Sequence, residues 1–219
     1  MAARVLKLAL TRVRAPAAAL FALLAVACTE TVATQPRPAL AELDAPLRRI
    51  AVMPFAASPS LLPEVDGPAP RVAAQLVSKY LAEALAARGV EVIAPEDVAA
   101  TLAEAGSSQN VAAVLAAKRG VDAIVRGDVT RWEERAGEAY GSFRPAAVGF
   151  RVALQAAPSG RTLWSAEFDE RQQPLGDNVL RAGKYPGAGT RWLTAEELAR
   201  WGAGETMRAL PLGPQAPKP

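Results

Sequence analysis

The stretch GVDAIVRGDVTRW, residues 120–132, constrains the fold more than any other part of the chain. It contains a short apolar run, Ala123 to Val125, which is typical of a strand covered on both faces of a sheet. Apolar and polar residues then alternate from Val129 to Trp132, so one face of the strand turns to solvent. Helix-like sequence precedes this stretch, and strand-like sequence follows it. We therefore expect it to form the middle strand of a mixed sheet.

The segments before this strand alternate between strand and helix patterns. The spacing of apolar residues predicts strands at 49–55 and 90–94 and helices at 71–88, 95–105 and 110–119. Gly89, Gly106 and Gly120 end the three helices in turn. Pro95 begins the second helix as a first-turn proline. A proline-rich loop at 56–70 separates the first strand from the first helix.

Two strands and one helix are predicted after the middle strand. A charged loop at 133–145 comes first, and residues 148–155 then alternate between apolar and polar side chains. The next strand places Trp164 and Phe168 on one face, and the turn at 158–160 joins the two strands as an antiparallel hairpin. Further along the chain, Thr194 and Glu197 have the spacing of a capping box, which begins a last helix over 195–209.

Some aromatic residues outside the predicted core have two interpretations each: Trp132, Tyr140, Phe143, Trp192 and Trp201. The first three, in or beside the charged loop, either pack on the domain's own sheet or form a contact surface. The last two flank the capping box. They either clamp the last helix to the sheet or help the segment 172–210 to dock on a neighbouring subunit.

These segments have the order β-α-β-α-α-β-β-β-α. This order predicts an α/β (α+β) fold, with a mixed sheet of about five strands and helices packed on it. We expect one domain over 47–210, with a core at 49–170 and a carboxyl-terminal extension at 171–210. Residues 211–219 are expected to form a disordered tail.

The first 27 residues have the pattern of a secretory signal peptide. Residues 1–14 carry positive charge, and residues 15–27 form an apolar run of 13 residues, which is too short to span a bilayer comfortably. The run ends in small residues directly before Cys28, the only cysteine of the chain. This junction resembles the lipobox of bacterial lipoproteins. Two alternatives stay open. The segment is either an ordinary secretory signal followed by an incidental cysteine, or a membrane anchor that is not cleaved.

The lipobox resemblance implies cleavage after Ala27 and acyl chains, palmitate among them, on Cys28. Several acyl chains hold a protein on a membrane far more firmly than one chain does. Thr29 follows the cysteine where an aspartate often signals retention in the inner membrane. We therefore expect a protein anchored in the outer membrane and facing the periplasm, in preference to the inner membrane or to secretion. Residues 28–46 are then a lipidated, flexible tether.

The basic charge of the chain belongs mainly to the signal segment. The whole chain has 25 Lys and Arg against 22 Asp and Glu, and a pI near 9.3. Four of the basic residues and none of the acidic residues lie in the first 27, so the remainder has 21 basic residues against 22 acidic ones. We therefore expect no nucleic-acid partner.

The composition also excludes several kinds of catalytic site. The absence of histidine and the single cysteine exclude Ser-His-Asp and Cys-His arrangements and a Cys/His zinc site. Glycines at 183–189 lack the helix and the Lys-Ser/Thr pair of a phosphate loop. The carboxylates nearest strand ends have no diagnostic spacing and are interpreted as solvated side chains: Asp122, Asp128, Asp169 and Glu170. We expect no catalytic, cofactor-binding or metal site.

The predicted domain resembles a group of bacterial envelope lipoproteins. The segments that carry the resemblance are IAVMPF at 50–55, GVEVI at 89–93, VDAIVRGDV at 121–129 and SGRTLW at 159–164. The group includes the CsgG-like family and the lipoprotein activators of penicillin-binding proteins, and the amino-terminal domain of TolB is similar. The resemblance covers roughly 50–170. It implies a non-enzymatic protein that binds another envelope component as a scaffold, assembly factor or activator.

Two other functions stay open at this point. One is a structural subunit of an oligomeric envelope or export complex, in which self-association replaces a separate partner. The other is a cell-wall hydrolase that uses a pair of carboxylates, for which Asp128 and Glu170 are the candidates.

Overall fold

A computed structural model of the chain describes residues 32–36, 46–61, 63, 67–106, 110–173, 184–186 and 191–212. These residues belong to one unit, 31–219, and the other unit, 1–30, lies outside them. The helices are α1 (Pro70–Ala86), α2 (Pro95–Ala105), α3 (Val111–Arg119) and α4 (Ala195–Ala209). The strands are β1 (Val32–Pro36), β2 (Arg49–Val52), β3 (Ala56–Ala57), β4 (Glu91–Ile93), β5 (Ala123–Glu133), β6 (Ala136–Glu138), β7 (Gly141–Arg144), β8 (Ala147–Ala156) and β9 (Thr162–Arg171).

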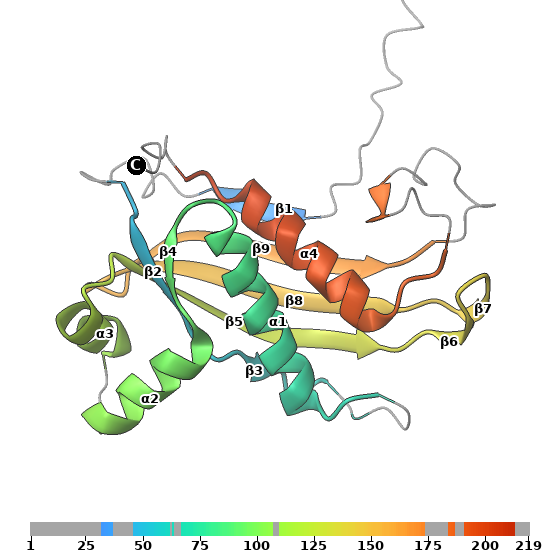
Figure 1. Cartoon of the computed structure of the whole chain (residues 1–219), viewed down its shortest axis with the longest axis horizontal. Coiled ribbons are helices and arrows are strands. Elements are labelled where there is room, and N and C mark those ends of the chain that lie inside the picture. Colours follow the sequence, from blue (N-terminus) through green and yellow to red (C-terminus); the bar gives the residue numbers. More distant parts are fainter. Residues whose placement is uncertain are drawn as a thin grey trace, which may run out of the picture. The chain divides into compact units, whose positions relative to one another are not determined.

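One mixed sheet organises these elements, and β5 is its central strand. The order is β1-β9-β8-β5-β2-β4, and β3 also pairs with β5 (Figure 1). β5 lies parallel to β2 and antiparallel to β8, and β8 and β9 form the predicted hairpin. The mixed α/β fold is therefore confirmed, with seven strands in the sheet instead of about five.

Alternation along β2 directs successive side chains to different helices. Ile50 and Val52 join the larger hydrophobic cluster, which contains residues of α1 and α4. Ala51, between them, joins a smaller cluster with Val98 of α2 and Leu115 of α3. Because successive side chains of a strand point to opposite faces, α1 and α4 cover one face of the sheet, and α2 and α3 cover the other face beside β2. The domain has three layers at that end.

The predicted helix ends are confirmed to within two residues. α1 ends before Gly89, and Gly106 follows α2. Gly120 ends α3 in the left-handed region, with a φ of 61°. Thr194 and Glu197 form the capping box that begins α4.

The irregular segments differ from the predictions. Part of the predicted tether forms β1, which pairs antiparallel with β9. A strand at a sheet edge is held mainly by backbone hydrogen bonds, so it does not need large apolar side chains. For this reason the composition of residues 32–36 does not reveal β1. The predicted loop at 133–145 contains the β6–β7 hairpin, and the first predicted strand ends at Val52, before Pro54. Residues 28–31, 37–45 and 213–219 lie outside the described residues.

α4 packs on the sheet through aromatic residues. Phe168 of β9 stacks on Phe150 of β8 with ring centroids 4.9 Å apart, and Trp201 of α4 meets Phe168 edge-on at 5.8 Å. The ring of Tyr185 lies 5.2 Å from that of Trp201. Trp201 therefore holds the last helix on its own sheet, as the clamp interpretation predicted.

Gln172 joins the end of β9 to the start of α4. Its amide nitrogen donates to the carbonyl oxygen of Arg191 at 2.9 Å. Its amide oxygen accepts a hydrogen bond from the backbone N–H of Leu193 at 2.6 Å. The side chain is buried, so both bonds are shielded from competition with water.

Gly202 allows α4 to approach β9 closely. A Cβ atom at this position would lie 2.5 Å from the Phe168 ring, whereas a Cβ at Gly204 would meet nothing within 4 Å. We expect Gly202→Ala to lower the free energy of unfolding by about 1–3 kcal/mol, because the ring or the helix has to move. Gly204→Ala, on the same helix, should raise it by up to about 1 kcal/mol. Urea unfolding of the two variants measures both effects, and equal effects would contradict this packing.

The capping box of α4 predicts a dependence of stability on pH. The hydrogen bonds that Arg191 donates to Glu197 lower the pKa of Glu197 to about 2, and the bonds from Thr194 act in the same direction. Because this pKa is lower in the folded protein, the carboxylate stabilises the fold above its ordinary pKa of 4.5, and this stabilisation is lost as the pH falls toward 2.

We therefore expect Glu197→Gln to destabilise the domain at neutral pH by less than about 1 kcal/mol, since the ion pair is partly exposed. The difference from the unsubstituted protein should shrink steadily below about pH 5, where the carboxylate of the unfolded chain begins to take up protons. Thermal unfolding across this pH range makes the measurement. If the stability difference between the two proteins stays constant down to low pH, the pKa of Glu197 is not lowered by folding.

Candidate functional site

Charged side chains gather on the sheet face opposite α1 and α4. They come from alternate positions of β5, β8 and β9: Arg126, Asp128, Arg131, Glu133, Arg151, Glu167, Asp169 and Arg171. We call this surface the open sheet face. Intervening residues such as Val152 and Phe168 are buried in the cluster beneath α1 and α4. Strand alternation thus separates a charged face from an apolar one.

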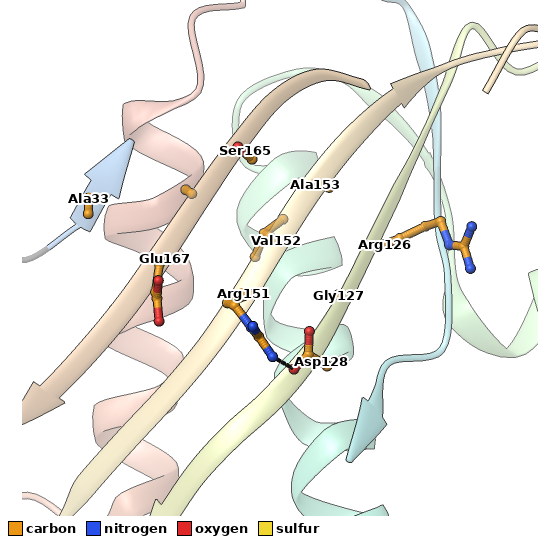
Figure 2. Close-up of a pocket in the computed structure, with 10 residues that line it drawn as sticks. Ala33, Arg126, Gly127, Asp128, Arg151, Val152, Ala153, Ser165 and Glu167 are labelled. Carbon is orange, nitrogen blue, oxygen red and sulfur yellow. Dashed lines mark hydrogen bonds and ion pairs between the residues drawn. The ribbon is translucent and has the colours of Figure 1, made fainter. Parts of the chain in front are cut away.

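A hollow of about 450 Å³ lies on the open sheet face (Figure 2). Small side chains line it, including Ala153 of β8, Ser165 of β9 and Ala33 of β1. Figure 2 shows Arg151 pointing to Asp128 across the neighbouring strands. The hollow exists because short side chains lie between longer, charged ones.

Arg151 and Asp128 form the central ion pair of the hollow. Arg151 Nη2 lies 2.8 Å from Asp128 Oδ2, and this hydrogen bond raises the pKa of Arg151. Glu167, on the other side of Arg151, acts in the same direction. Arg126 lines the same hollow, points away from this pair (Figure 2), and forms no ion pair with any residue that the structure describes. Among the described residues it is therefore the cation of the hollow without an ionic partner.

Two further ion pairs join β5 to β9 and cross over β8, which lies between them. Arg131 of β5 binds Asp169 of β9, and both residues are paired in register with Gly149 of β8. A Cβ at Gly149 would lie 2.8 Å from Thr130 Oγ1 and 3.5 Å from Asp169 Oδ1. The absence of a side chain at Gly149 therefore opens the path for this pair.

The second crossing pair joins Arg171 of β9 to Glu133 of β5, with Nη2 and Oε2 2.5 Å apart. It passes over Ala147, which is fully buried. The open sheet face therefore carries charges that are largely paired across strands.

The other candidate carboxylates have structural partners. Asp122 accepts hydrogen bonds from the backbone N–H groups of Arg48 and Arg49, both at 2.8 Å, and so fixes the start of β2 against β5. Glu170 is 8% exposed, and its oxygens accept hydrogen bonds from Tyr185 Oη at 2.6 Å and Lys184 Nζ at 2.7 Å. The interpretation as a solvated carboxylate is therefore wrong for Glu170, because the sequence does not show that Lys184 and Tyr185 return to β9.

Asp128 and Glu170 lie on opposite faces of the sheet. Asp128 is in register with Arg151 and, through it, with Glu167, all on the open sheet face. Glu170 is three residues beyond Glu167, which turns it to the helix-covered face. Two carboxylates that flank one glycosidic bond need to share a face and lie within about 10 Å of each other. The structure does not bring this candidate pair together.

The aromatic residues near the predicted loop have different roles. Trp132 is 4% exposed and donates its indole N–H to Glu134 at 2.9 Å, so it packs on its own sheet. Tyr140, at the tip of the β6–β7 hairpin, is 83% exposed. The Phe143 side chain lies outside the described residues. Trp192 is half-buried, and its backbone N–H donates to the carbonyl oxygen of Ala139.

The predicted lipidation site, Cys28, and the predicted signal peptide at 1–27 lie outside the described residues. Among the described residues there is no helix that is long and apolar enough to cross a membrane. The same part of the chain holds no cluster of three or more side chains of the types that bind metals.

Comparison with known proteins found similar solved structures only. No protein-family model and no curated protein matches the chain. A PelC dodecamer from Paraburkholderia phytofirmans is 17% identical over 80% of this chain and 93% of its own, with a TM-score of 0.47. Lipoprotein GNA1162 from Neisseria meningitidis is 21% identical over 60% and 90%, with a TM-score of 0.41. The LpoB C-terminal domain from Salmonella enterica is 13% identical over 62% and 94%, with a TM-score of 0.39.

At these values the similarity identifies neither a family nor a function for the chain. One of these similar structures, GNA1162, is called a lipoprotein. The CsgG-like and TolB-like parts of the predicted resemblance stay predictions.

The different surroundings of the two carboxylates predict different effects on stability. Glu170→Gln leaves Lys184, which is 19% exposed, without its counter-charge, and should lower the free energy of unfolding by about 1–3 kcal/mol. Asp128→Asn removes only an exposed pair and should change it by less than about 1 kcal/mol. Urea unfolding of the domain without residues 1–28 measures both. A larger loss of unfolding free energy for Asp128→Asn than for Glu170→Gln would contradict the conclusion that Glu170 is the carboxylate in a buried ion pair.

Proposed function

We propose that the chain is a bacterial lipoprotein that is acylated at Cys28 after cleavage behind Ala27. Its domain faces the periplasm from the outer membrane and binds another envelope component without catalysing a reaction. The observation that carries the proposal is the position of the chain's only cysteine, directly after an apolar run of 13 residues with basic residues before it. This is the place where the lipoprotein pathway uses a cysteine.

The arrangement of the carboxylates supports binding in preference to hydrolysis. Asp128 is held by Arg151 at 2.8 Å, and Glu170 is buried on the other face with Lys184 and Tyr185. A general acid needs a carboxyl group whose proton is free to reach a substrate. Both groups are committed to partners within the domain.

The open sheet face is the proposed contact surface for the partner. Its charges are mostly paired across strands, so they are held in place before a partner arrives, which reduces the entropy lost on binding. Arg126 in the hollow has no ionic partner among the described residues, and it favours a protein segment that presents a carboxylate to it. The partner is therefore proposed to be an envelope protein that lies across β5, β8 and β9.

A structural subunit of an oligomeric envelope complex is the second candidate. The sheet ends in β1 on one side and β4 on the other, and neither pairs with a further described strand at its outer edge. Unpaired edges are templates for addition of a strand from another chain. Size-exclusion chromatography with light scattering distinguishes the two functions, since a monomer disfavours the oligomeric subunit.

Labelling of growing cells with radioactive palmitate tests the anchor. The unsubstituted protein should incorporate label, and Cys28→Ala should incorporate none. Label on the Cys28→Ala variant would show that the cysteine is not the acylated residue.

Photo-crosslinking in cells tests the contact surface. A photoreactive amino acid replaces Ser165, which lines the hollow on the open sheet face and leaves Arg126 in place, or, as a control, Lys79 on the exposed side of α1. We expect one dominant envelope protein to crosslink at position 165 and not at position 79. Crosslinks only to further copies of this chain would favour the oligomeric subunit, and equal crosslinking at both positions would contradict the proposed surface.

A further inference from the structure

The edge strand β1 begins very close to the proposed lipidation site. Three residues separate Cys28 from Val32, the first residue of β1. β1 pairs with β9 over five residues, from Val32 opposite Phe168 to Pro36 opposite Trp164. The Val32 side chain packs against the hydrophobic core. The strand is thus joined to the sheet by its backbone and, among its described side chains, by the apolar side chain of Val32.

Chain length then limits how far the sheet edge lies from the acyl chains. Four Cα–Cα steps lead from Cys28 to Val32, and they span at most about 14 Å. If β1 did not pair with β9, the first residue after Cys28 that packs in the domain would be Leu47. The chain from Cys28 to Leu47 can extend to about 65 Å. Pairing of β1 with β9 therefore changes the lipid linkage from a long tether to a short one.

The two edges of the sheet also differ in charge. β1, with the sequence VATQP, has no charged residue. The opposite edge, β4, begins with Glu91, which forms an exposed ion pair with Arg49. Edge strands that face water commonly carry charges that discourage pairing with other chains. An uncharged edge is better suited to a place where another surface covers it.

From the short linkage and the uncharged edge, we propose that the β1 edge of the sheet faces the bilayer surface and that β4 faces away from it. This inference rests on the proposed acylation of Cys28. The sheet is six strands wide, so β4 lies about 24 Å farther from the lipid than β1 does. Both broad faces of the sheet then stand away from the membrane.

Energy transfer from the protein to the lipid surface tests this orientation. The lipidated protein is placed in vesicles of phosphatidylethanolamine and phosphatidylglycerol whose headgroups carry an acceptor dye. Single donor dyes are attached at Glu167→Cys, beside Ala33 of β1, or at Glu91→Cys on β4. The thiol of Cys28 is occupied by its acyl group and does not react. We expect transfer from position 167 to be at least twice that from position 91, and equal transfer would overturn the proposal.

Two variants test the role of β1 itself. Successive N–H groups of a strand point to opposite sides, so Ala33→Pro with Thr34→Pro removes one N–H that faces β9. The second variant inserts 15 Gly and Ser residues before Val32 and leaves the β1 sequence intact. Both should reduce transfer from position 167, whereas Ala33→Ser with Thr34→Ser should not. Unchanged transfer in the insertion variant would overturn the proposal even if the proline variant unfolds.

Vesicle flotation before the measurement separates this inference from the proposed function. Protein that does not float with the vesicles is not anchored, and both proposals then fail. Protein that floats but shows equal transfer from positions 167 and 91 keeps the lipoprotein function and excludes the membrane-facing β1 edge.

Discussion

The pairing of β5 with strands on both sides is the interaction on which the rest of the structure depends. β5 joins a parallel half, made with β2 and β4, to an antiparallel half, made with β8 and β9. Its first residues, Ala123 to Val125, are buried on both faces, beneath α1 on one side and beside α3 on the other. Further along β5, the described helices cover only one face of the sheet. The change from a doubly buried to a half-buried strand produces both the core and the open sheet face.

Much of this fold follows from local sequence patterns. The apolar run of β5, the hairpin of β8 and β9 and the capping box at Thr194 depend on neighbouring residues, and all three are present. The alternation in β5 was less simple than the pattern indicated. Val129 and Trp132 are both buried in the same cluster although they are three positions apart, an odd spacing, because the register shifts between Val129 and Arg131. A β-bulge of this kind is visible only once the partner strand is known.

The features that escaped prediction depend on contacts between distant parts of the chain. β1 joins β9 across more than 120 residues of sequence, and its composition resembles that of a linker. Lys184 and Tyr185 reach Glu170 from a segment rich in turn residues. The Arg131–Asp169 pair needs β5 and β9 to lie on either side of a glycine. Periodicity carries no information about such pairings, so the sequence alone predicts Asp128 and Asp169 as separate solvated carboxylates.

The side chain of Gln172 has a consequence for how this domain tolerates change. The buried amide of Gln172, the residue that follows β9, bonds to the backbone of both Arg191 and Leu193, just before α4. The two ends of the intervening segment are therefore fixed together, and the free energy of closing such a loop rises only slowly with its length. Insertions between 174 and 183 should leave the sheet and α4 in place. This position suits an internal epitope or a fluorescent domain, because an insertion there leaves both the sequence around Cys28 and the carboxyl terminus unaltered.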